Sequence, residues 1–343
     1  MANMSRLYKT LIIGVGSIGH RHLRCFQATG RVEASICEPN DELRQQLAQE
    51  HSVRKTYASL EAALAEQYDA AVIATPAPLH VPMAIQLAEA GIHVLIEKPL
   101  STSLDGIESL RKVIAQHGIV AAVAYVYHAH PVLQAMKAAL ASGRFGRPVQ
   151  LVAVCGQHFP TYRPAYRAIY YRDRATGGGA IQDALTHVLN LGEWLIGPIE
   201  RLLADAAHQV LPGVEVEDTV HVLTRQGRAL GCYSLNQHQA PNEITVTVIC
   251  EGGTVRFENH ACRWRWMLRP NDPWHDEALE EIPRDALFVA QAEGFLAALE
   301  DRAPPLCTLE EGIQTLRVNL AALASVRDGT WQMIPVQGGG AAT

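Results

Sequence analysis

Long apolar runs, paired cysteines and clusters of basic residues are all scarce in this 343-residue chain. No apolar run reaches the ~18 residues that a membrane-spanning helix needs, and residues 1–9 lack the apolar core and small-residue cleavage site of a secretory signal. The seven cysteines are an odd number and none of them form a CxxC pair, which is typical of a protein in the reducing cytoplasm. We therefore expect a cytoplasmic protein with no membrane partner.

The net charge and the spacing of the histidines argue against nucleic-acid binding and against a metal site. The formal net charge is -6 and no basic block or stripe is present, so nucleic acid is not an expected partner. His20 and His22 form an HxH pair, as do His128 and His130, but neither pair has a cysteine or carboxylate cluster beside it in the sequence. The sequence therefore predicts isolated histidines and no metal site.

The first third of the chain alternates short apolar runs with helical patterns, which indicates a parallel sheet covered by helices. After about residue 128 the pattern changes to closely spaced strands that alternate polar and apolar residues, which indicates a large, mainly antiparallel sheet with one open face. We thus expect an α/β domain over residues 1–127 and an α+β domain over 128–343, ending in a disordered Gly-rich tail. The first domain has predicted strands at 10–16, 32–38, 70–76, 92–99 and 119–127 and helices at 17–29, 41–51, 79–90 and 103–117. The second has predicted strands at 149–157, 199–209, 217–225, 229–238, 243–250 and 253–259 and helices at 131–142, 177–196, 286–300 and 309–327.

The segment GVGSIGHRH (14–22) follows the first strand and opens a helix. Gly14, Gly16 and Gly19 form a G-x-G-x-x-G pattern, which is typical of a dinucleotide pyrophosphate site at a helix N-terminus. A glycine-rich turn without a ligand is the alternative. Glu38 ends the second strand, where a carboxylate can accept hydrogen bonds from an adenosine ribose and repel a 2′-phosphate. We therefore predict NAD rather than NADP, with the loop, including Ser17 and Ile18, contacting the cofactor.

Two strand ends should line the same crevice, because ligands of open parallel sheets bind beyond the carboxyl ends of the strands. The sequence EKP places Glu97 and Lys98 after one strand, and Lys98 can donate to a carbinol or carbonyl oxygen. A surface lysine is the alternative. The sequence ATPAPLH places Thr75, Pro76 and His80 after the preceding strand, with His80 equally able to be a cap or a packed core residue.

The segment GGGAIQDALTH (177–187) puts Asp183 and His187 four residues apart, on one face of a helix. The glycines would let the backbone pass close to a cofactor and substrate. Alone, this stretch is also compatible with an ordinary helix start and a buried histidine. Together with the glycine loop and EKP, it resembles the Gfo/Idh/MocA oxidoreductases over nearly the whole chain. The resemblance implies an N-terminal Rossmann domain, a C-terminal domain with an open sheet, and NAD(P)-dependent oxidation or reduction of a sugar, sugar acid, nucleotide sugar or inositol.

By this resemblance, Lys98 matches the catalytic lysine of the family, Asp183 and His187 match its active-site carboxylate and histidine, and the bond before Pro99 is a candidate for the cis form. His187 would take the hydroxyl proton as hydride leaves the same carbon. The chain also departs from the family. Val126 and His128 stand where an Asn and an Arg are frequent, and Asn190 replaces a second carboxylate.

Substrate contacts are expected from Tyr125 and His128 and from the Tyr/Arg-rich stretch at 158–176, which leads into the Asp183 helix. Its arginines could meet an anionic group and its tyrosines could stack on a sugar, although a surface loop or subunit contact is an equal alternative. The residues concerned are Arg163, Arg167, Tyr170, Arg172 and Arg174.

Three functions remain open on the sequence. An NAD-dependent dehydrogenase is favoured, an NAD-dependent glycoside hydrolase that oxidises transiently is an alternative, and a non-catalytic NAD sensor is a third. The exposed apolar face expected for the second sheet predicts a homodimer or homotetramer.

Overall fold

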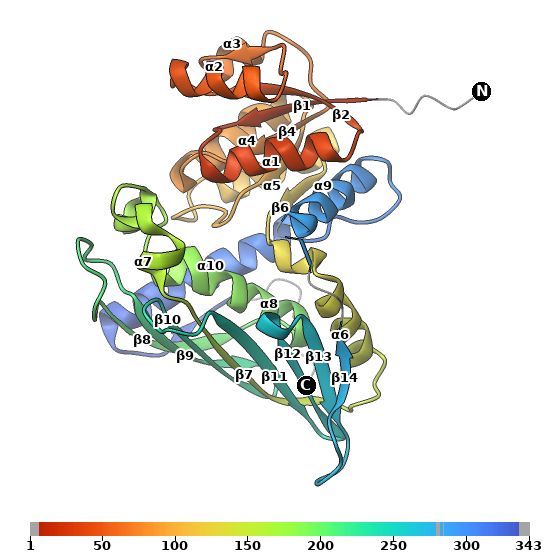
Figure 1. Ribbon diagram of the computed structural model, residues 1–343, viewed down its shortest axis with the longest axis vertical. Coiled ribbons are helices and arrows are strands. Elements are labelled where there is room, and N and C mark those ends of the chain that lie inside the picture. Colours follow the sequence, from red (N-terminus) through yellow and green to blue (C-terminus); the bar gives the residue numbers. More distant parts are fainter. Residues whose placement is uncertain (1–6, 279–281, 284, 336–343) are drawn as a thin grey trace. The chain divides into compact units, whose positions relative to one another are not determined.

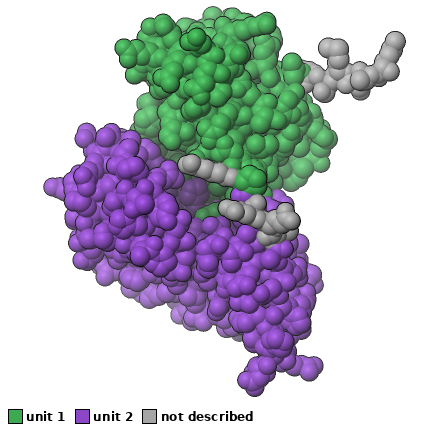
Figure 2. Space-filling view, viewed as in Figure 1, with its two compact units in different colours: residues 1–129, 283–312 green, residues 130–282, 313–343 purple. Residues whose placement is uncertain are grey.

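The computed structural model describes residues 7–278, 282–283 and 285–335, so the expected disordered tail lies outside the described residues. The chain divides into two compact units (Figure 2). Unit 1 contains residues 1–129 and 283–312, and unit 2 contains residues 130–282 and 313–343. The sequence places a single boundary at 127/128, whereas the structure returns the segment 283–312 to the first unit.

Unit 1 is built on a six-stranded sheet whose strand order is β3-β2-β1-β4-β5-β6 (Figure 1). All neighbouring strands are parallel, as the alternating pattern predicts, and this order is that of the Rossmann fold. The central strands β4 and β5 are mostly apolar, and all of their residues except His93 are buried. Their bounds are β1 Tyr8–Ile13, β2 Val32–Cys37, β3 Thr56–Tyr57, β4 Ala70–Ile73, β5 His93–Ile96 and β6 Ala121–Val123.

The helices of unit 1 include α9, which comes from the late segment of the chain. Phe295 of α9 lies edge-on to Phe26 of α1, with ring centroids 6.3 Å apart, and Arg31 Nη1 donates to Glu293 Oε2 at 2.6 Å. These contacts explain why 283–312 belongs with the first unit. The helices are α1 Ser17–Ala28, α2 Asp41–Glu50, α3 Leu60–Ala63, α4 His80–Glu89, α5 Ile107–His117 and α9 Ala286–Leu299, with 3-10 turns at Ala77–Leu79 and Val126–Ala129.

Unit 2 is built on a nine-stranded sheet with the order β14-β13-β12-β11-β7-β10-β9-β8-β15. Every neighbouring pair is antiparallel except β7 and β10, so the predicted mainly antiparallel sheet is confirmed. The sequence misses β13 and the two edge strands, β14 and β15. The bounds are β7 Pro148–Gly156, β8 Arg201–Ala207, β9 Thr219–Gln226, β10 Ala229–Asn236, β11 Glu243–Cys250, β12 Gly253–Glu258, β13 Arg263–Met267, β14 His275–Ala278 and β15 Gln332–Met333.

One face of this sheet is packed and the other is open. On the packed side, Ser325 Oγ of α10 accepts from Ala204 N of β8 at 2.9 Å. On the opposite face Leu223 is 48% exposed, and its cross-strand neighbours Leu203 and Cys232 are partly exposed. The helices are α6 Pro131–Ala141, α7 Phe159–Tyr162, a π-helix at Ile181–Leu185, α8 Thr186–Ile196 and α10 Leu309–Asp328, which begins in unit 1, with 3-10 turns at Pro164–Arg167, Tyr170–Arg172, Arg174–Thr176 and Asn259–Ala261. Among the described residues, no helix is long and apolar enough to cross a membrane.

Candidate active site

The glycine loop joins β1 to α1 as a compact turn with one open side. Gly14 has φ +77°, and a Cβ there would lie 2.9 Å from the carbonyl oxygen of Ala74. A Cβ at Gly19 would overlap the carbonyl oxygen of Gly14, so these two positions require glycine. A Cβ at Gly16, in contrast, would meet nothing within 4 Å. The exposed side of Gly16 and Ser17 is therefore the space in which a pyrophosphate would lie, beside the first-turn amides of Ser17, Ile18 and Gly19.

Glu38 lies beside this loop, at the end of β2. Its Oε2 accepts from the amide of Val15 at 3.1 Å, and its Oε1 accepts from the amide of Asn40 at 2.9 Å. The carboxylate thus fixes the loop to the strand end while its remaining lone pairs can receive ribose hydroxyls. Arg44 Nη1 donates to the carbonyl of Glu38 at 2.7 Å, so a cation also stands at this strand end.

Lys98 follows β5 and is half-buried, and the Lys98–Pro99 peptide bond is cis, as the resemblance implies. The amide of Lys98 donates to Glu97 Oε2 at 3.0 Å. Oε1 of the same carboxylate lies 2.6 Å from Nε2 of His22, and both side chains are buried. A histidine on α1 therefore supports the residue that precedes the lysine. His22 is therefore not the isolated histidine that the sequence predicts, because its partner Glu97 lies 75 positions away and no local pattern joins the two.

His80 contacts the backbone that follows both β4 and β5. His80 is 1% exposed, its Nδ1 lies 3.0 Å from the carbonyl oxygen of Pro99, and its Nε2 lies 2.7 Å from that of Thr75. Burial lowers the pKa of His80, although both carbonyls and Glu97 oppose this shift. His80 thus connects the ends of β4 and β5, whereas Thr75 and Pro76 keep exposed surface at this edge of the sheet.

In unit 2, Gly178 and Gly179 are needed for packing against the protein itself. A Cβ at Gly178 would overlap the carbonyl oxygens of Tyr170 and Tyr171, and one at Gly179, where φ is +86°, would lie 2.5 Å from Glu217 Oε1. Glu217 is fully buried and accepts from the amide of Ile181 at 3.1 Å. These glycines therefore allow the start of the helix to pack closely on a buried carboxylate. The sequence predicts a close approach to a cofactor and substrate and gives no sign of this internal contact.

Asp183 and His187 both project from this helix and are both partly exposed. Asp183 lies in the π-helical turn and His187 in the first turn of α8. Tyr170 Oη donates to Asp183 Oδ1 at 2.6 Å, which fixes the carboxylate. The Nδ1 atom of His187 is buried, so Nε2 is the ring atom that can reach a ligand. The π-helix widens the turn at Asp183, a feature frequent at functional sites.

The stretch 158–176 has a small core of its own. Phe159, Tyr166 and Tyr171 pack together with apolar residues from 211–216. Two of its arginines form hydrogen bonds within the protein. Arg167 Nε donates to the carbonyl of Pro212 at 2.8 Å, and Arg174 Nε donates to Glu217 Oε2 at 2.8 Å.

The side chains of Arg163 and Arg172 on the same stretch are exposed and make no hydrogen bond or ion pair within the described part of the chain. The anchored loop therefore carries two cations whose guanidinium groups face solvent.

Three residues at or beside the positions where this chain differs from the family pattern are buried: Tyr125, His128 and Asn190. Tyr125 and His128 are each 1% exposed, and His128 Nδ1 lies 2.6 Å from the carbonyl oxygen of Leu306. Asn190 Nδ2 donates to Thr315 Oγ1 at 3.1 Å and so connects α8 to α10. Burial makes direct substrate contact by Tyr125 and His128 less favourable than the sequence pattern indicates. Val126 begins a 3-10 turn.

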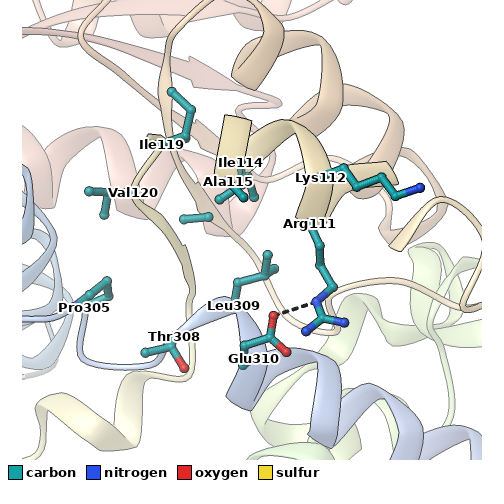
Figure 3. A pocket seen from close by; sticks show the side chains of 11 residues that line it. Arg111, Lys112, Ile114, Ala115, Ile119, Val120, Pro305, Thr308, Leu309 and Glu310 are labelled. Carbon is teal, nitrogen blue, oxygen red and sulfur yellow. Dashed lines mark hydrogen bonds and ion pairs between the residues drawn. The ribbon is translucent and has the colours of Figure 1, made fainter. Parts of the chain in front are cut away.

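A cavity of about 600 Å³ lies elsewhere in unit 1 (Figure 3). None of the residues predicted to bind the cofactor line it. Arg111 points into it, but its Nε donates to Glu310 Oε1 at 2.8 Å and its Nη1 to Glu108 at 3.2 Å, so its charge is neutralised. The lining comprises Arg111, Lys112, Ile114, Ala115, Ile119, Val120, Ala121, Pro305, Thr308, Leu309 and Glu310.

Comparisons with known proteins agree with this arrangement. Residues 8–125 match the model of an oxidoreductase family with an NAD-binding Rossmann fold, and residues 133–256 match the GFO/IDH/MocA C-terminal domain. The chain is 27% identical to a UDP-N-acetylglucosamine 3-dehydrogenase from Acidithiobacillus ferrooxidans, covering 92% of this chain and 95% of the relative. It is 28% identical to a myo-inositol dehydrogenase from Streptomyces leeuwenhoekii, covering 94% and 99%.

A solved structure extends the comparison. The WlbA dehydrogenase from Bordetella pertussis, in complex with NADH and UDP-GlcNAcA, superposes with a TM-score of 0.84 at 27% identity, covering 97% of this chain and 99% of that one.

Proposed function

Because the chain belongs to the Gfo/Idh/MocA oxidoreductase family, we propose that Lys98, Asp183 and His187 carry out its reaction, a hydride transfer between NAD and a hydroxyl-bearing carbon of a sugar, sugar acid, nucleotide sugar or inositol. Unit 1 binds the cofactor, and unit 2 supplies substrate contacts and the assembly surface. The observation that supports this most directly is the Glu38 carboxylate beside the open side of Gly16.

The residues around the glycine loop meet the requirements of NAD. The first-turn amides of α1 face the pyrophosphate position and Glu38 receives the adenosine ribose. When bound, NAD supplies the carbon that accepts the hydride with its electron pair.

The remaining chemistry belongs to side chains. The Lys98 ammonium donates a hydrogen bond to the substrate oxygen and stabilises the negative charge that develops there. As the C–H bond breaks, Nε2 of His187 takes the hydroxyl proton, and the carbinol becomes a ketone. Asp183, held by Tyr170, orients the imidazole or a neighbouring hydroxyl.

The substrate that this site favours carries a negative charge. On the anchored stretch that leads to Asp183, Arg163 and Arg172 are exposed and lack the protein partners that Arg167 and Arg174 have in the described part of the chain. Guanidinium groups pair well with phosphate and carboxylate. The relatives that act on UDP-N-acetylglucosamine or bind UDP-GlcNAcA support this choice.

We propose a homo-oligomer in the cytoplasm. The exposed apolar stripe of Leu203, Leu223 and Cys232 on the open sheet face supports the assembly. The location is supported by the odd number of cysteines and by the lack of a CxxC pair in the sequence.

The test is a substrate panel followed by the absorbance of NADH. The panel contains NAD⁺ with UDP-N-acetylglucosamine, UDP-GlcNAcA, myo-inositol and uncharged monosaccharides. A dehydrogenase produces one NADH for each substrate oxidised, and the anionic sugars should react with the highest kcat/KM. Glycosidic cleavage without net NADH would instead identify the hydrolase, and cofactor binding without turnover on any compound would identify a sensor.

A further inference from the structure

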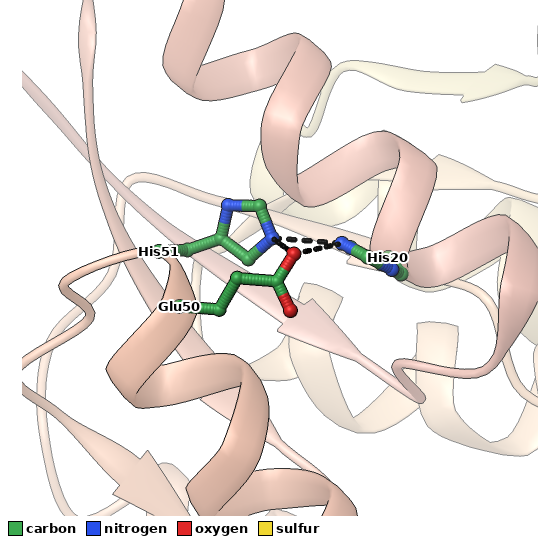
Figure 4. Close-up of side chains that lie close together, drawn as sticks. All are labelled: His20, Glu50 and His51. Atoms are coloured by element: carbon green, nitrogen blue, oxygen red, sulfur yellow. Dashed lines mark hydrogen bonds and ion pairs between the residues drawn. The ribbon is translucent and has the colours of Figure 1, made fainter.

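Three potential metal ligands, His20, Glu50 and His51, lie close together in unit 1 (Figure 4). His20 Nε2 lies 2.7 Å from His51 Nε2. Glu50 Oε1 lies 3.4 Å from His51 Nε2 and 3.8 Å from His20 Nε2. All three ligand atoms lie within 4.8 Å of one another. The sequence-based expectation of an isolated His20 therefore overlooks a carboxylate and a second imidazole from another helix.

The backbone fixes these side chains from two directions. His20 lies in the first turn of α1, directly after Gly19, whereas Glu50 is the last residue of α2 and His51 is its C-cap. Gln27 Nε2 of α1 donates to the carbonyl of His51 at 2.9 Å, which holds the end of α2 against α1. The carbonyl end of a helix favours a nearby cation, so the position of Glu50 and His51 adds to the attraction of the carboxylate.

The spacing approaches that of a zinc-type site. Nitrogen and oxygen ligands lie ~2.0–2.2 Å from Zn²⁺, so tetrahedral ligands are about 3.3 Å apart. The two distances from Glu50, 3.4 and 3.8 Å, are slightly longer than this value, and the two imidazole nitrogens, 2.7 Å apart, need to separate by about half an ångström. The side chains of His20, Glu50 and His51 are 27%, 50% and 15% exposed, so an ion can enter without unfolding.

The local charges are compatible with a cation. Arg24, one turn further along α1, opposes a cation, but its Nε donates to Asp285 Oδ2 at 2.6 Å and its charge is paired.

A second group, His128, Cys307 and Glu311, also has its ligand atoms within 4.8 Å of one another, but its atoms already have structural roles. Glu311 Oε2 accepts from the amide and hydroxyl of Thr308, as in a capping box at the start of α10. Because this group contains Cys307, a metal bound there would show a thiolate band, which distinguishes it from the first group.

We propose that His20, Glu50 and His51 form a binding site for a divalent transition metal of the zinc class, with three protein ligands and a position left for water. A bound ion would join the first turn of α1 to the end of α2. The site is separate from the Lys98, Asp183 and His187 chemistry, so it does not depend on the proposed reaction.

The test uses the full-length chain stripped of metal with a chelator and titrated with Co²⁺. We expect one equivalent to bind, with visible ligand-field bands of nitrogen and oxygen ligands and no thiolate-to-cobalt charge-transfer band, and Zn²⁺ should displace it. His20→Ala, His51→Ala and Glu50→Gln should each weaken binding by about tenfold or more. Matched controls are His117→Ala and Glu89→Gln, which change exposed residues at the ends of α5 and α4 and should bind as the wild type does.

Three results would overturn the proposal: no saturable Co²⁺ binding by the wild type, unchanged binding in the ligand variants, or a thiolate band that Cys307→Ala removes. Circular dichroism checks the fold of each variant. If a histidine variant does not fold, Glu50→Gln decides, because Glu50 is half-exposed and the amide keeps its shape.

Discussion

Nε2 of His22 and Oε1 of Glu97 lie 2.6 Å apart in the interior of unit 1, 75 residues apart in the chain. Their side chains are 1% and 6% exposed, so the pair connects α1 to the residue before Lys98 without help from water. The Glu97 carboxylate thus contacts both His22 of α1 and the amide of Lys98, and so links the helix after the glycine loop to the lysine.

The first prediction concerns this pair. His22→Ala leaves Glu97 buried without its imidazole partner, and leaving a buried hydrogen-bonding group without its partner costs about 1–3 kcal/mol of unfolding free energy. Urea unfolding followed by circular dichroism measures the loss. His117→Ala, at an exposed position, should change stability by less than about 0.5 kcal/mol. A loss for His22→Ala no larger than that of the control would contradict the assigned role.

The second prediction concerns cofactor choice. Glu38→Ser removes the ribose acceptor and the charge that repels a 2′-phosphate, while Arg44 stays at the strand end. Losing a charged hydrogen bond costs about 1.5–3 kcal/mol, so NADH affinity should fall about tenfold or more, and the NADPH/NADH affinity ratio should rise. Fluorescence titration measures both.

The neighbouring Asn40 should be left unchanged in this experiment. Its Oδ1 accepts from the amide of Leu43 at 3.0 Å and caps α2. An arginine at this position would add a positive charge for a 2′-phosphate, but losing the cap would cost about 1 kcal/mol of stability and would obscure the effect of Glu38→Ser. Glu33→Gln, at an exposed position earlier on β2, is the control. Tighter binding of NADPH than NADH by the wild type would refute the assignment of Glu38.

The third prediction concerns the chemistry. Lys98→Ala and His187→Ala should each lower kcat by about 10²–10⁴-fold, the usual contribution of an acid–base group, with little change in NADH affinity. Steady-state kinetics with the best panel substrate test this. Near-wild-type turnover of His187→Ala would place the proton acceptor elsewhere.

The fourth prediction concerns acid sensitivity. His130 is 3% exposed beside the ring of Phe257, and burial lowers its pKa to about 4. Since this value lies below the ~6.5 of an unfolded chain, the unfolded state binds the proton more readily. The stabilising contribution is complete above about pH 6.5 and is lost as the pH falls towards 4, by about 3 kcal/mol.

This prediction is checked by urea unfolding at a series of pH values. His130→Gln should show a flatter dependence than the wild type between about pH 6.5 and 4, whereas His117→Gln should not. Parallel curves for wild type and His130→Gln would show that His130 makes no such contribution.

The fifth prediction concerns assembly. Leu223→Asp places a charge in the middle of the open apolar stripe, which an interface would have to bury without a partner. We expect light scattering to show an oligomer for the wild type and a monomer for the variant, with circular dichroism unchanged. Glu215→Gln, at an exposed position outside the sheet, is the control. A monomeric wild type would remove the basis of this prediction.

The sequence predicts most of the sheet strands because their apolar runs and flanking turns are local signals. Ile12, Val72 and Leu95 are buried on strands that the pattern identifies directly. The short edge strands are missed because β14, with all four residues exposed, has no apolar pattern.

The site follows the same division. The glycine loop and Glu38 are recognisable because the loop has a fixed spacing and Glu38 closes the next strand. Pairs such as His22–Glu97 and His20–His51 have no such signal, since only the packing of α1 against other elements brings together residues 75 and 31 positions apart. Gly179 illustrates a third case, because the glycine run is visible in sequence while its reason, the buried Glu217, is distant.

The return of α9 to unit 1 has a practical consequence for protein engineering. A fragment ending at residue 129 would expose Phe26 and leave Arg31 without Glu293, because both contacts come from the late segment. Moving this cofactor-binding unit into another enzyme therefore requires three junctions, one near residue 129 and a pair flanking 283–312. A chimera made with a single crossover would lack α9 and its contacts with α1.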